Sequence, residues 1–211
     1  MKLQLALDTT TIDEAVELVK KTEKWIDIIE IGTPMLIEYG VEAVRIMKKS
    51  FPNHLVLADA KIMDAGELEA SMCFKAGADI VTVLGVSHLT TIANTVKAAK
   101  AVNKMVMVDM IDVENLVEKT KAIDALGVDY ICVHTAFDLQ GEKAEPMEEL
   151  MEVNRIISKS QSAVAGGVKL TTIKKVVGCD PEVIVVGGGI TNQEDPAKTA
   201  QAIKEAMEEE Q

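Results

Sequence analysis

Eight short apolar segments recur along the chain at nearly regular intervals, and each has the length and composition of a buried β-strand. They are Leu3–Leu7, Asp27–Ile31, Leu55–Asp59, Asp79–Leu84, Met105–Asp109, Asp129–His134, Ser162–Ala165 and Val183–Val186. The intervening segments have the apolar period of helices, as in Ile12–Lys20 and Thr91–Ala99. Buried strands that alternate with helices form parallel sheets. Eight such units in 211 residues predict a small (β/α)8 TIM barrel, with a doubly wound open sheet as the alternative.

The composition fits one domain spanning residues 1–211, because 48% of the residues are hydrophobic and 27% are charged. The net charge of −12 argues against nucleic acid or an anionic membrane as the main partner. No apolar run approaches the roughly 20 residues of a membrane-spanning helix, and the N-terminus does not resemble a signal peptide. Three scattered cysteines, without disulfide or metal-ligand spacing, favour a cytoplasmic protein.

Ionisable side chains stand at or near the C-terminal ends of five of the predicted strands. They are Asp8, Glu30, Asp59 with Lys61, Asp109 and His134. In a parallel barrel these strand ends all lie on one face, which is the face where such enzymes carry out their chemistry. A single acid at a strand end is often a helix cap, but five such ends predict a shared site and favour the barrel over the open sheet.

The stretch Leu55–Asp64 concentrates charge most strongly, because a buried strand leads directly into Asp59, Lys61 and Asp64. Side chains alternate along a strand, so Asp59 and Lys61 are expected to point the same way. Burying such a pair costs several kcal/mol per ion unless its geometry compensates. This favours a functional site. The structural alternative is an ordinary ion pair, with Asp64 as a helix N-cap in capping-box spacing to Glu67.

The last two predicted strands are followed by glycine clusters instead of charges. Gly166 and Gly167 follow the seventh strand, and Gly187, Gly188 and Gly189 follow the eighth. Glycine lets backbone amides approach a ligand closely, and the loops after strands seven and eight form the usual phosphate site of this barrel. A pair of glycines can also be only a tight turn. Two clusters at these two places predict a phosphate-binding site.

The pattern Asp59-x-Lys61-x-x-Asp64, together with Asp8, Glu30, His134 and both glycine loops, resembles the orotidine 5′-monophosphate decarboxylase suprafamily over essentially the whole chain. Within it, the sequence is most similar to the 3-hexulose-6-phosphate synthase family, whose near relative is 3-keto-L-gulonate-6-phosphate decarboxylase. The decarboxylase pattern has Glu at position 109, arginines around His134 and Arg at position 189. This chain has Asp109, His134-Thr135-Ala136-Phe137-Asp138 and Gly189. One departure from the synthase pattern is His88, where Asp is expected.

The resemblance implies an aldolase-type lyase that reversibly condenses formaldehyde with ribulose 5-phosphate through an enediolate. It implies that Glu30 and Asp59 hold Mg²⁺, with Mn²⁺ as a possible substitute, because carboxylate oxygens suit a hard cation. Lys61 would add positive charge near the enediolate, kept protonated by Asp59 and Asp64. The resemblance also implies a homodimer in which Asp64 reaches the partner's site.

His134 is the candidate base, because histidine titrates near neutral pH; the alternative is a core histidine bonded to a backbone carbonyl. By resemblance, Asp109 would orient His134 or a substrate hydroxyl, and Asp8 would bind substrate hydroxyls. The phosphate would be bound by four glycine amides, those of Gly166, Gly167, Gly188 and Gly189.

Three other functions remain open from the sequence. The first is sugar-phosphate decarboxylation through the same type of intermediate. The second is a non-catalytic barrel that binds sugar phosphate, against which the complete set of acids, Lys61 and His134 argues. The third is a pentulose-phosphate epimerase, whose metal-binding histidines have no counterpart, because His54 and His88 are poorly placed.

Overall fold

A computed structural model of the protein describes residues 1–8, 11–139 and 146–209. Its strands form one closed barrel in chain order, with every neighbouring pair parallel and β8 paired with β1. The strands are β1 (Lys2–Leu7), β2 (Ile28–Ile31), β3 (Leu55–Ile62), β4 (Ile80–Leu84), β5 (Met105–Asp109), β6 (Tyr130–His134), β7 (Gln161–Ala165) and β8 (Val183–Val186). The predicted (β/α)8 barrel is confirmed, and the open-sheet alternative is wrong.

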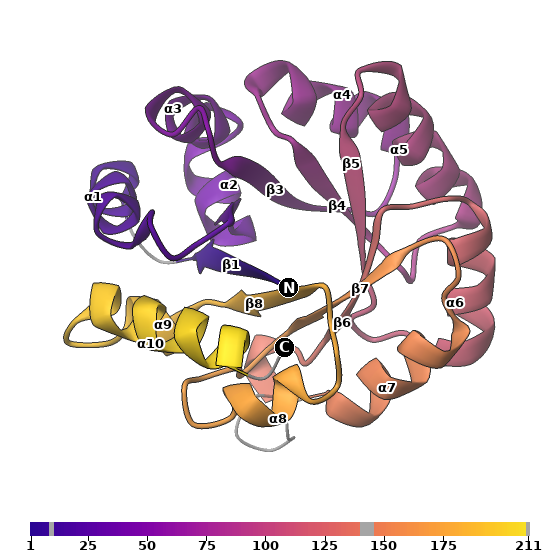
Figure 1. Cartoon of the computed structure of the whole chain (residues 1–211). Helices are drawn as coiled ribbons and strands as arrows, with labels where there is room; N and C mark the ends of the chain where they lie inside the picture. The colour runs from indigo at the N-terminus through magenta and orange to yellow at the C-terminus, as the bar shows by residue number, and fades with distance from the viewer. Residues whose placement is uncertain (9–10, 140–145, 210–211) are drawn as a thin grey trace.

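The helices surround the strands, as Figure 1 shows. They are α1 (Ile12–Thr22), α2 (Thr33–Tyr39), α3 (Glu42–Ser50), α4 (Gly66–Ala76), α5 (Leu89–Ala101), α6 (Leu116–Ala125), α7 (Met147–Ile156), α8 (Ile173–Val177), α9 (Gly188–Thr191) and α10 (Pro196–Glu209), with a 3₁₀ turn at Phe137–Leu139. The predicted helices Ile12–Lys20 and Thr91–Ala99 lie within α1 and α5. The sequence did not predict the second helix after β2 or the short α9.

Alternation along the strands produces two apolar cores. One side of each strand packs against the helices, as Leu3, Leu5 and Leu7 of β1 do. The other side fills the barrel interior. This inner core contains Ala6, Ile28, Leu57, Ile80, Met107, Tyr130, Cys132, Ala163, Ala165, Val183 and Val185. Apolar side chains thus fill much of the barrel interior, and the charged side chains of the site lie at its C-terminal end.

Local sequence signals begin and end several helices as expected. Thr11 caps α1 in a capping box, with its hydroxyl accepting from the Glu14 amide and the Glu14 carboxylate accepting from the Thr11 amide. Gly77 ends α4 with φ of 110°, and Gly127 follows α6 with φ of 71°. Both are left-handed conformations that favour glycine. These glycines therefore start the two turns that lead into β4 and β6.

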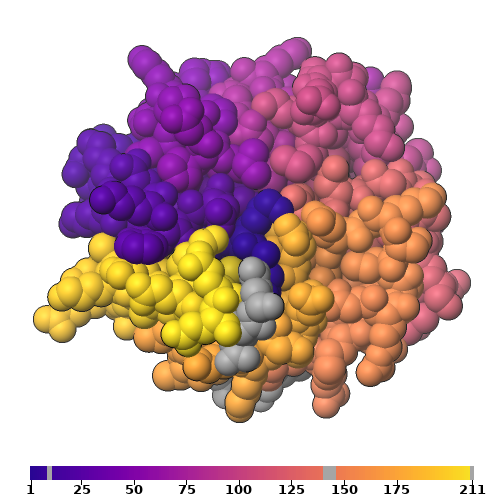
Figure 2. Space-filling model, in the orientation of Figure 1, coloured from indigo at the N-terminus to yellow at the C-terminus, as the bar shows by residue number. Residues whose placement is uncertain are grey.

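The N-terminal end of the barrel is closed by the first residues of the chain. Figure 2 shows the indigo N-terminus near the centre of this face, beside the yellow helix α10. The Lys2 ammonium donates to the Glu182 carboxylate and lies 6.0 Å from the centroid of the Tyr130 ring. In the described ranges, no helix combines the length and apolar character needed to cross a membrane.

Candidate active site

A continuous row of contacts joins four of the predicted residues at the C-terminal ends of β3, β5 and β6. Lys61 Nζ lies 2.5 Å from Asp59 Oδ2 and 3.3 Å from Asp109 Oδ2. Asp109 in turn lies 3.0 Å from Nδ1 of His134. Asp59 and Asp109 are buried, while Lys61 and His134 are half-buried. The structure therefore places a carboxylate, an ammonium, a second carboxylate and an imidazole in sequence across the barrel mouth.

His134 is oriented by Asp109 and not by a backbone carbonyl. Because a carboxylate can only accept, Nδ1 of His134 carries the proton of this hydrogen bond, which leaves Nε2 as a proton acceptor. Burial raises the pKa of Asp109, but the hydrogen bond and charge of His134 and the charge of Lys61 outweigh it, and the pKa is lowered. Asp109 is thus an anion that can hold an imidazolium in place.

Lys61 is held as an ammonium by its neighbours. Burial lowers its pKa, but the charges of Asp59 and Asp109 outweigh burial and raise the pKa above the ordinary value. The predicted contribution of Asp64 to the charge of Lys61 stays a prediction, because it was expected across a homodimer. The second carboxylate beside Lys61 is that of Asp109, whereas the exposed Asp64 accepts from the next amide, Ala65, at 2.7 Å.

Asp64 does not cap the helix that follows it. The residue at the N-cap of α4 is Ala65, and no side chain bonds to the first turn there. The capping-box alternative for Asp64 and Glu67 is therefore wrong. The predicted role of Asp64 in the site of a partner subunit stays a prediction.

Glu30 lies at the centre of a group of like charges. It is buried on β2, and the amide of Gln4 donates to its Oε2 at 2.6 Å. Burial and the charge of Asp59 raise its pKa to about 8. Desolvation, followed by the charge of Asp59, also raises the pKa of Asp8 at the end of β1. Three carboxylates thus interact at adjoining strand ends, and Lys61 is the cation beside Asp59.

This donor set fits a hard divalent cation. In the part of the chain that the structure describes, no three His, Cys, Asp or Glu side chains are grouped as metal ligands. A cation would therefore take two protein carboxylates, those of Glu30 and Asp59, and complete its shell with water or substrate, as Mg²⁺ commonly does. The raised pKa of Glu30 supports this fit, because a cation would relieve the repulsion that raises it.

The two glycine loops lie against each other. Gly166 and Gly167 have φ angles of 96° and 76°, which residues with a side chain rarely adopt. A Cβ on Gly189 would come within 2.4 Å of the carbonyl oxygen of Val168, so the loops after β7 and β8 approach closely. Gly188 and Gly189 begin α9, where the first amides have no partner within the helix. The predicted phosphate-binding glycines are therefore brought together.

Several residues of the site were not predicted from the sequence. Thr33 and Thr82 hold the Asp59 carboxylate, with hydroxyl-to-oxygen distances of 2.9 and 2.8 Å. Gln4 holds Glu30, and Gly32 leaves room for Asp8, because a Cβ there would lie 2.1 Å from Asp8 Oδ1. A polar residue at an inward position of a barrel strand would have been the signal for Gln4 and Thr82.

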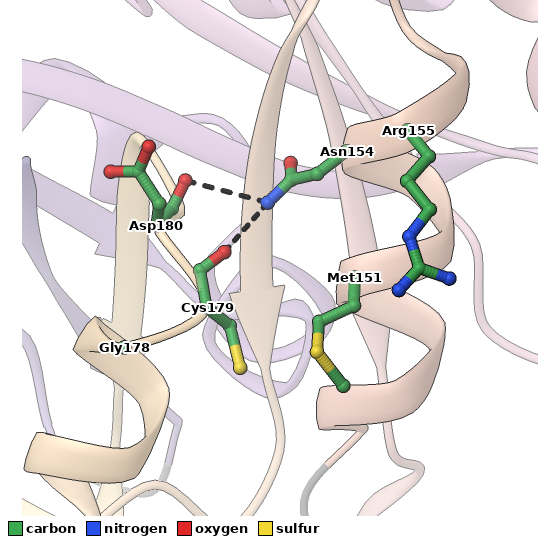
Figure 3. Close-up of a pocket in the computed structure, with 6 residues that line it drawn as sticks. All are labelled: Met151, Asn154, Arg155, Gly178, Cys179 and Asp180. Carbon is green, nitrogen blue, oxygen red and sulfur yellow. Dashed lines mark hydrogen bonds between the residues drawn. The ribbon is translucent and has the colours of Figure 1, made fainter.

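A separate polar hollow lies between α7 and the turn that follows α8, and Figure 3 shows its lining residues. There the Asn154 side chain donates to the carbonyl oxygens of Cys179 and Asp180, at 2.7 and 3.4 Å. A neighbouring hollow that shares Asn154 reaches the starts of β1, β7 and β8. These hollows are therefore at the opposite end of the barrel from the predicted site, and they contain none of its residues.

The family model described as "Orotidine 5'-phosphate decarboxylase / HUMPS family" matches residues 1–203. The chain belongs to this family. Within the family, the 3-hexulose-6-phosphate synthase of Bacillus subtilis (strain 168) is 49% identical over 207 residues, which are 98% of this chain and 99% of that one. The resemblance that the motifs indicated is thus confirmed.

Solved structures of family members agree with this assignment. A 3-hexulose-6-phosphate synthase from Salmonella typhimurium covers 100% of both chains with a TM-score of 0.97 and 42% identity. A 3-keto-L-gulonate-6-phosphate decarboxylase from Vibrio cholerae covers 99% of this chain and 97% of its own, with a TM-score of 0.87 and 25% identity. The chain is thus more similar to these synthases than to this decarboxylase.

Proposed function

We propose that the protein is an aldehyde-lyase that condenses formaldehyde with D-ribulose 5-phosphate to give a 3-hexulose 6-phosphate, and that catalyses the reverse reaction. The observation that carries this proposal is the row of contacts Asp59–Lys61–Asp109–His134 beside the glycine loops. The names of the relatives, 3-hexulose-6-phosphate synthase in both Bacillus subtilis and Salmonella typhimurium, support it.

His134 is the base in this mechanism. Its Nε2 takes a proton from C1 of ribulose 5-phosphate, next to the C2 ketone, and the C–H electron pair passes to the ketone oxygen to form an enediolate. Asp109 at 3.0 Å stabilises the imidazolium that results. C1 then forms a bond to the formaldehyde carbon, the π pair of the aldehyde passes to its oxygen, and that oxygen takes back the proton held by His134. The former C2 ketone becomes C3 of the hexulose product.

Lys61 provides fixed positive charge next to the developing oxyanion. Its position between Asp59 and Asp109 keeps the ammonium charged and oriented before the substrate binds. Mg²⁺, held by Glu30 and Asp59, would supply further stabilisation of negative charge on oxygen, with Mn²⁺ as a possible substitute. Asp8 lies near Gly32 and Gly187 at the barrel mouth and would accept hydrogen bonds from substrate hydroxyls.

The phosphate end of the sugar would bind at the paired glycine loops. Gly166 and Gly167 turn the backbone in left-handed conformations, and Gly188 and Gly189 present the first amides of α9. Such amides bind phosphate dianions by hydrogen bonds and by the helix dipole. This arrangement would place the reacting end of the sugar toward Lys61 and His134.

We also infer a homodimer with shared active sites. Apolar side chains around Asp64 are exposed, namely Met63 (52%), Leu68 (65%) and Met72 (51%). Such a surface favours association with a second copy.

In a mixture of Asp64→Ala and His134→Gln proteins, mixed dimers would contain one intact site. We expect the mixture to recover about a quarter of the wild-type activity, as random assembly of a two-fold dimer requires. No recovery would contradict the shared site.

The three cysteines support a reducing compartment such as the cytoplasm. Cys73, Cys132 and Cys179 are all free thiols. Burial raises the pKa of each, which keeps them protonated and slow to react. We propose a cytoplasmic location on this basis, to be checked by fractionation of cells that express the protein.

The deciding experiment supplies ribulose 5-phosphate, formaldehyde and Mg²⁺ to the purified protein and follows formaldehyde consumption. We expect consumption only when all three are present, loss with a chelator and recovery with Mg²⁺ or Mn²⁺. His134→Gln should lower kcat on the order of 1,000-fold. Release of carbon dioxide from 3-keto-L-gulonate 6-phosphate at a higher kcat/KM would contradict the proposal. Sugar-phosphate binding without any turnover would instead indicate a non-catalytic barrel.

A further inference from the structure

The strand that carries Asp59 and Lys61 is irregular at these residues. Ala58 of β3 pairs with Val81 of β4, and the next paired residues are Ile62 and Val83. Asp59, Ala60 and Lys61 therefore all lie opposite the single residue Thr82. Such a bulge bends the strand and redirects side chains, and bulges are frequent beside active sites. The predicted alternation of Asp59 and Lys61 is interrupted here, although their side chains still meet.

Lys61 has an uncommon backbone conformation within this bulge. Its φ is 45°, in the left-handed region that non-glycine residues rarely adopt. Backbone strain of this kind persists only where surrounding contacts hold it. Register with β4 is lost at this point, so the Lys61 amide needs another acceptor. Contacts from β4 must therefore stabilise the bulge.

The Thr82 hydroxyl supplies that contact and a second one. Its Oγ1 accepts from the Lys61 amide at 2.9 Å and donates to Asp59 Oδ1 at 2.8 Å. The other oxygen of Asp59, Oδ2, is shared by Lys61 Nζ and the Thr33 hydroxyl. One hydroxyl thus holds both the backbone of Lys61 and the carboxylate of Asp59.

Packing alone does not account for a threonine at position 82. The side chain is 4% exposed, and the inward residues Ile80 and Met107 on β4 and the adjacent β5 are apolar. Valine would fill the same volume without a buried hydroxyl, whose desolvation is costly unless it forms hydrogen bonds. The two bonds of Thr82 offset that cost, and both end on the Asp59–Lys61 pair.

We propose that Thr82 is a positioning residue that fixes Lys61 relative to Asp59 by holding the bulge between them. Thr82 does not need to touch the substrate. If the Thr82 hydroxyl is removed, the Lys61 amide loses its acceptor and Asp59 Oδ1 loses a donor. The Lys61 ammonium is then no longer held in its position. The consequence for catalysis, but not the positioning itself, rests on the proposed function.

The test compares Thr82→Val with Thr82→Ser, which keeps the hydroxyl. The matched control is Thr120→Val, because Thr120 is also buried and its hydroxyl has no partner among the described residues. For Thr82→Val we expect kcat to fall on the order of 100-fold, as expected for a catalytic group displaced by about 1 Å, with little change in KM. Thr82→Ser should restore kcat, and Thr120→Val should leave it unchanged.

Crystal structures of the three variants give a readout that does not need activity. We expect the Lys61–Asp59 contact and the left-handed Lys61 conformation to be lost in Thr82→Val and kept in Thr82→Ser. A Thr82→Val protein with both features intact would overturn the proposal, as would equal losses of kcat in the valine and serine variants. If the wild type shows no turnover, the proposed function fails, and the crystal structures alone decide the role of Thr82.

Discussion

The two ends of the barrel use carboxylates in opposite ways. At the N-terminal end, Asp79 accepts from Lys48 and Lys104 at 2.8 and 2.6 Å and from the Val56 amide. Burial raises its pKa, but these donors outweigh burial and lower it. At the C-terminal end, Glu30 is surrounded by other carboxylates, and its pKa is raised to about 8. The first arrangement satisfies the charge of the carboxylate within the protein, whereas in the second the carboxyl groups repel one another.

Carboxylates whose charge is satisfied inside the protein have a structural role, as a second example shows. Asp124, near the end of α6, accepts from the amides of Ser158, Lys159 and Ser160, which lie just before β7. These three amides satisfy the Asp124 carboxylate without a ligand. Glu30 and Asp8 have like charges as neighbours, and a folded protein keeps such an arrangement only where something else compensates.

The largest effect is expected from replacing Lys61 at the site end, and Lys104 at the opposite end provides the comparison. Lys61→Met removes the cation beside the reacting oxygen, so we expect kcat for the condensation to fall on the order of 1,000-fold. Lys104→Met removes one donor from Asp79, which keeps Lys48 and the Val56 amide, so we expect unchanged kcat and a loss of about 1 kcal/mol in the free energy of unfolding. Steady-state kinetics and urea unfolding measure both.

The contrast between the two lysines depends on kcat changing in only one of the two variants. If Lys104→Met lowered kcat as much as Lys61→Met, both ends would contribute to catalysis and the division between them would be wrong. Circular dichroism of each variant at the assay temperature confirms that kcat is measured on folded protein.

Asp124 should show the largest effect on stability. In Asp124→Ala the amides of Ser158, Lys159 and Ser160 lose their acceptor, so we expect a loss of about 2 kcal/mol in the free energy of unfolding, with kcat unchanged. Burial raises the pKa of Asp124, but its hydrogen bonds outweigh burial and lower it to about 2.

A depressed carboxyl pKa gives a defined pH dependence. The contribution of Asp124 is complete above its ordinary pKa of 3.8 and is lost as pH falls toward about 2. The difference in stability between wild type and Asp124→Ala should therefore shrink between pH 4 and pH 2, as measured by urea unfolding. A constant difference over that range would show that the charge of Asp124 is not what holds these amides.

The sequence predicted those parts of the protein that depend on periodicity. Alternation and strand spacing predicted the barrel, and parallel strands in a closed barrel bring Asp8, Glu30, Asp109 and His134 to one face. These are properties of backbone geometry that every strand of the barrel obeys. The family assignment followed from the same residues.

Contacts that depend on irregular backbone could not be predicted. The bulge in β3 places three residues opposite Thr82, which no regular pairing predicts. For the same reason Lys61 reaches Asp109, a partner that the sequence did not predict, in addition to Asp59. Gln4 was overlooked because its role depends on the register of β1 with β2, in which the neighbouring Ala6 pairs with Glu30.

Gln4 offers a smaller test of the site end. Its amide donates to Glu30, while its Oε1 is buried with no partner among the described residues. Gln4→Met keeps the volume and removes both groups, so we expect little change in stability. Residues that hold a metal ligand in place typically contribute 10- to 100-fold to metal affinity. We therefore expect the half-saturating concentration of Mg²⁺ to rise about tenfold. Activity measured across Mg²⁺ concentrations checks this, and an unchanged half-saturating concentration would contradict it.

The smallest effect is a gain in stability from Glu30→Gln. The folded state raises the pKa of Glu30 from 4.5 to about 8, so this group's stabilising contribution is complete below the lower value and is lost as pH rises through the higher one. Glutamine stays neutral throughout and can still accept from Gln4. In chelator at pH 8.5, we expect the variant to melt roughly 3 °C above wild type, which corresponds to about 1 kcal/mol. Near pH 5 the two should melt together, and added Mg²⁺ should raise Tm in the wild type but not in the variant. If wild type and variant instead lost stability in parallel as pH rose, the negative charge at the site end would not be a cost to folding, and the contrast between the two barrel ends would fail.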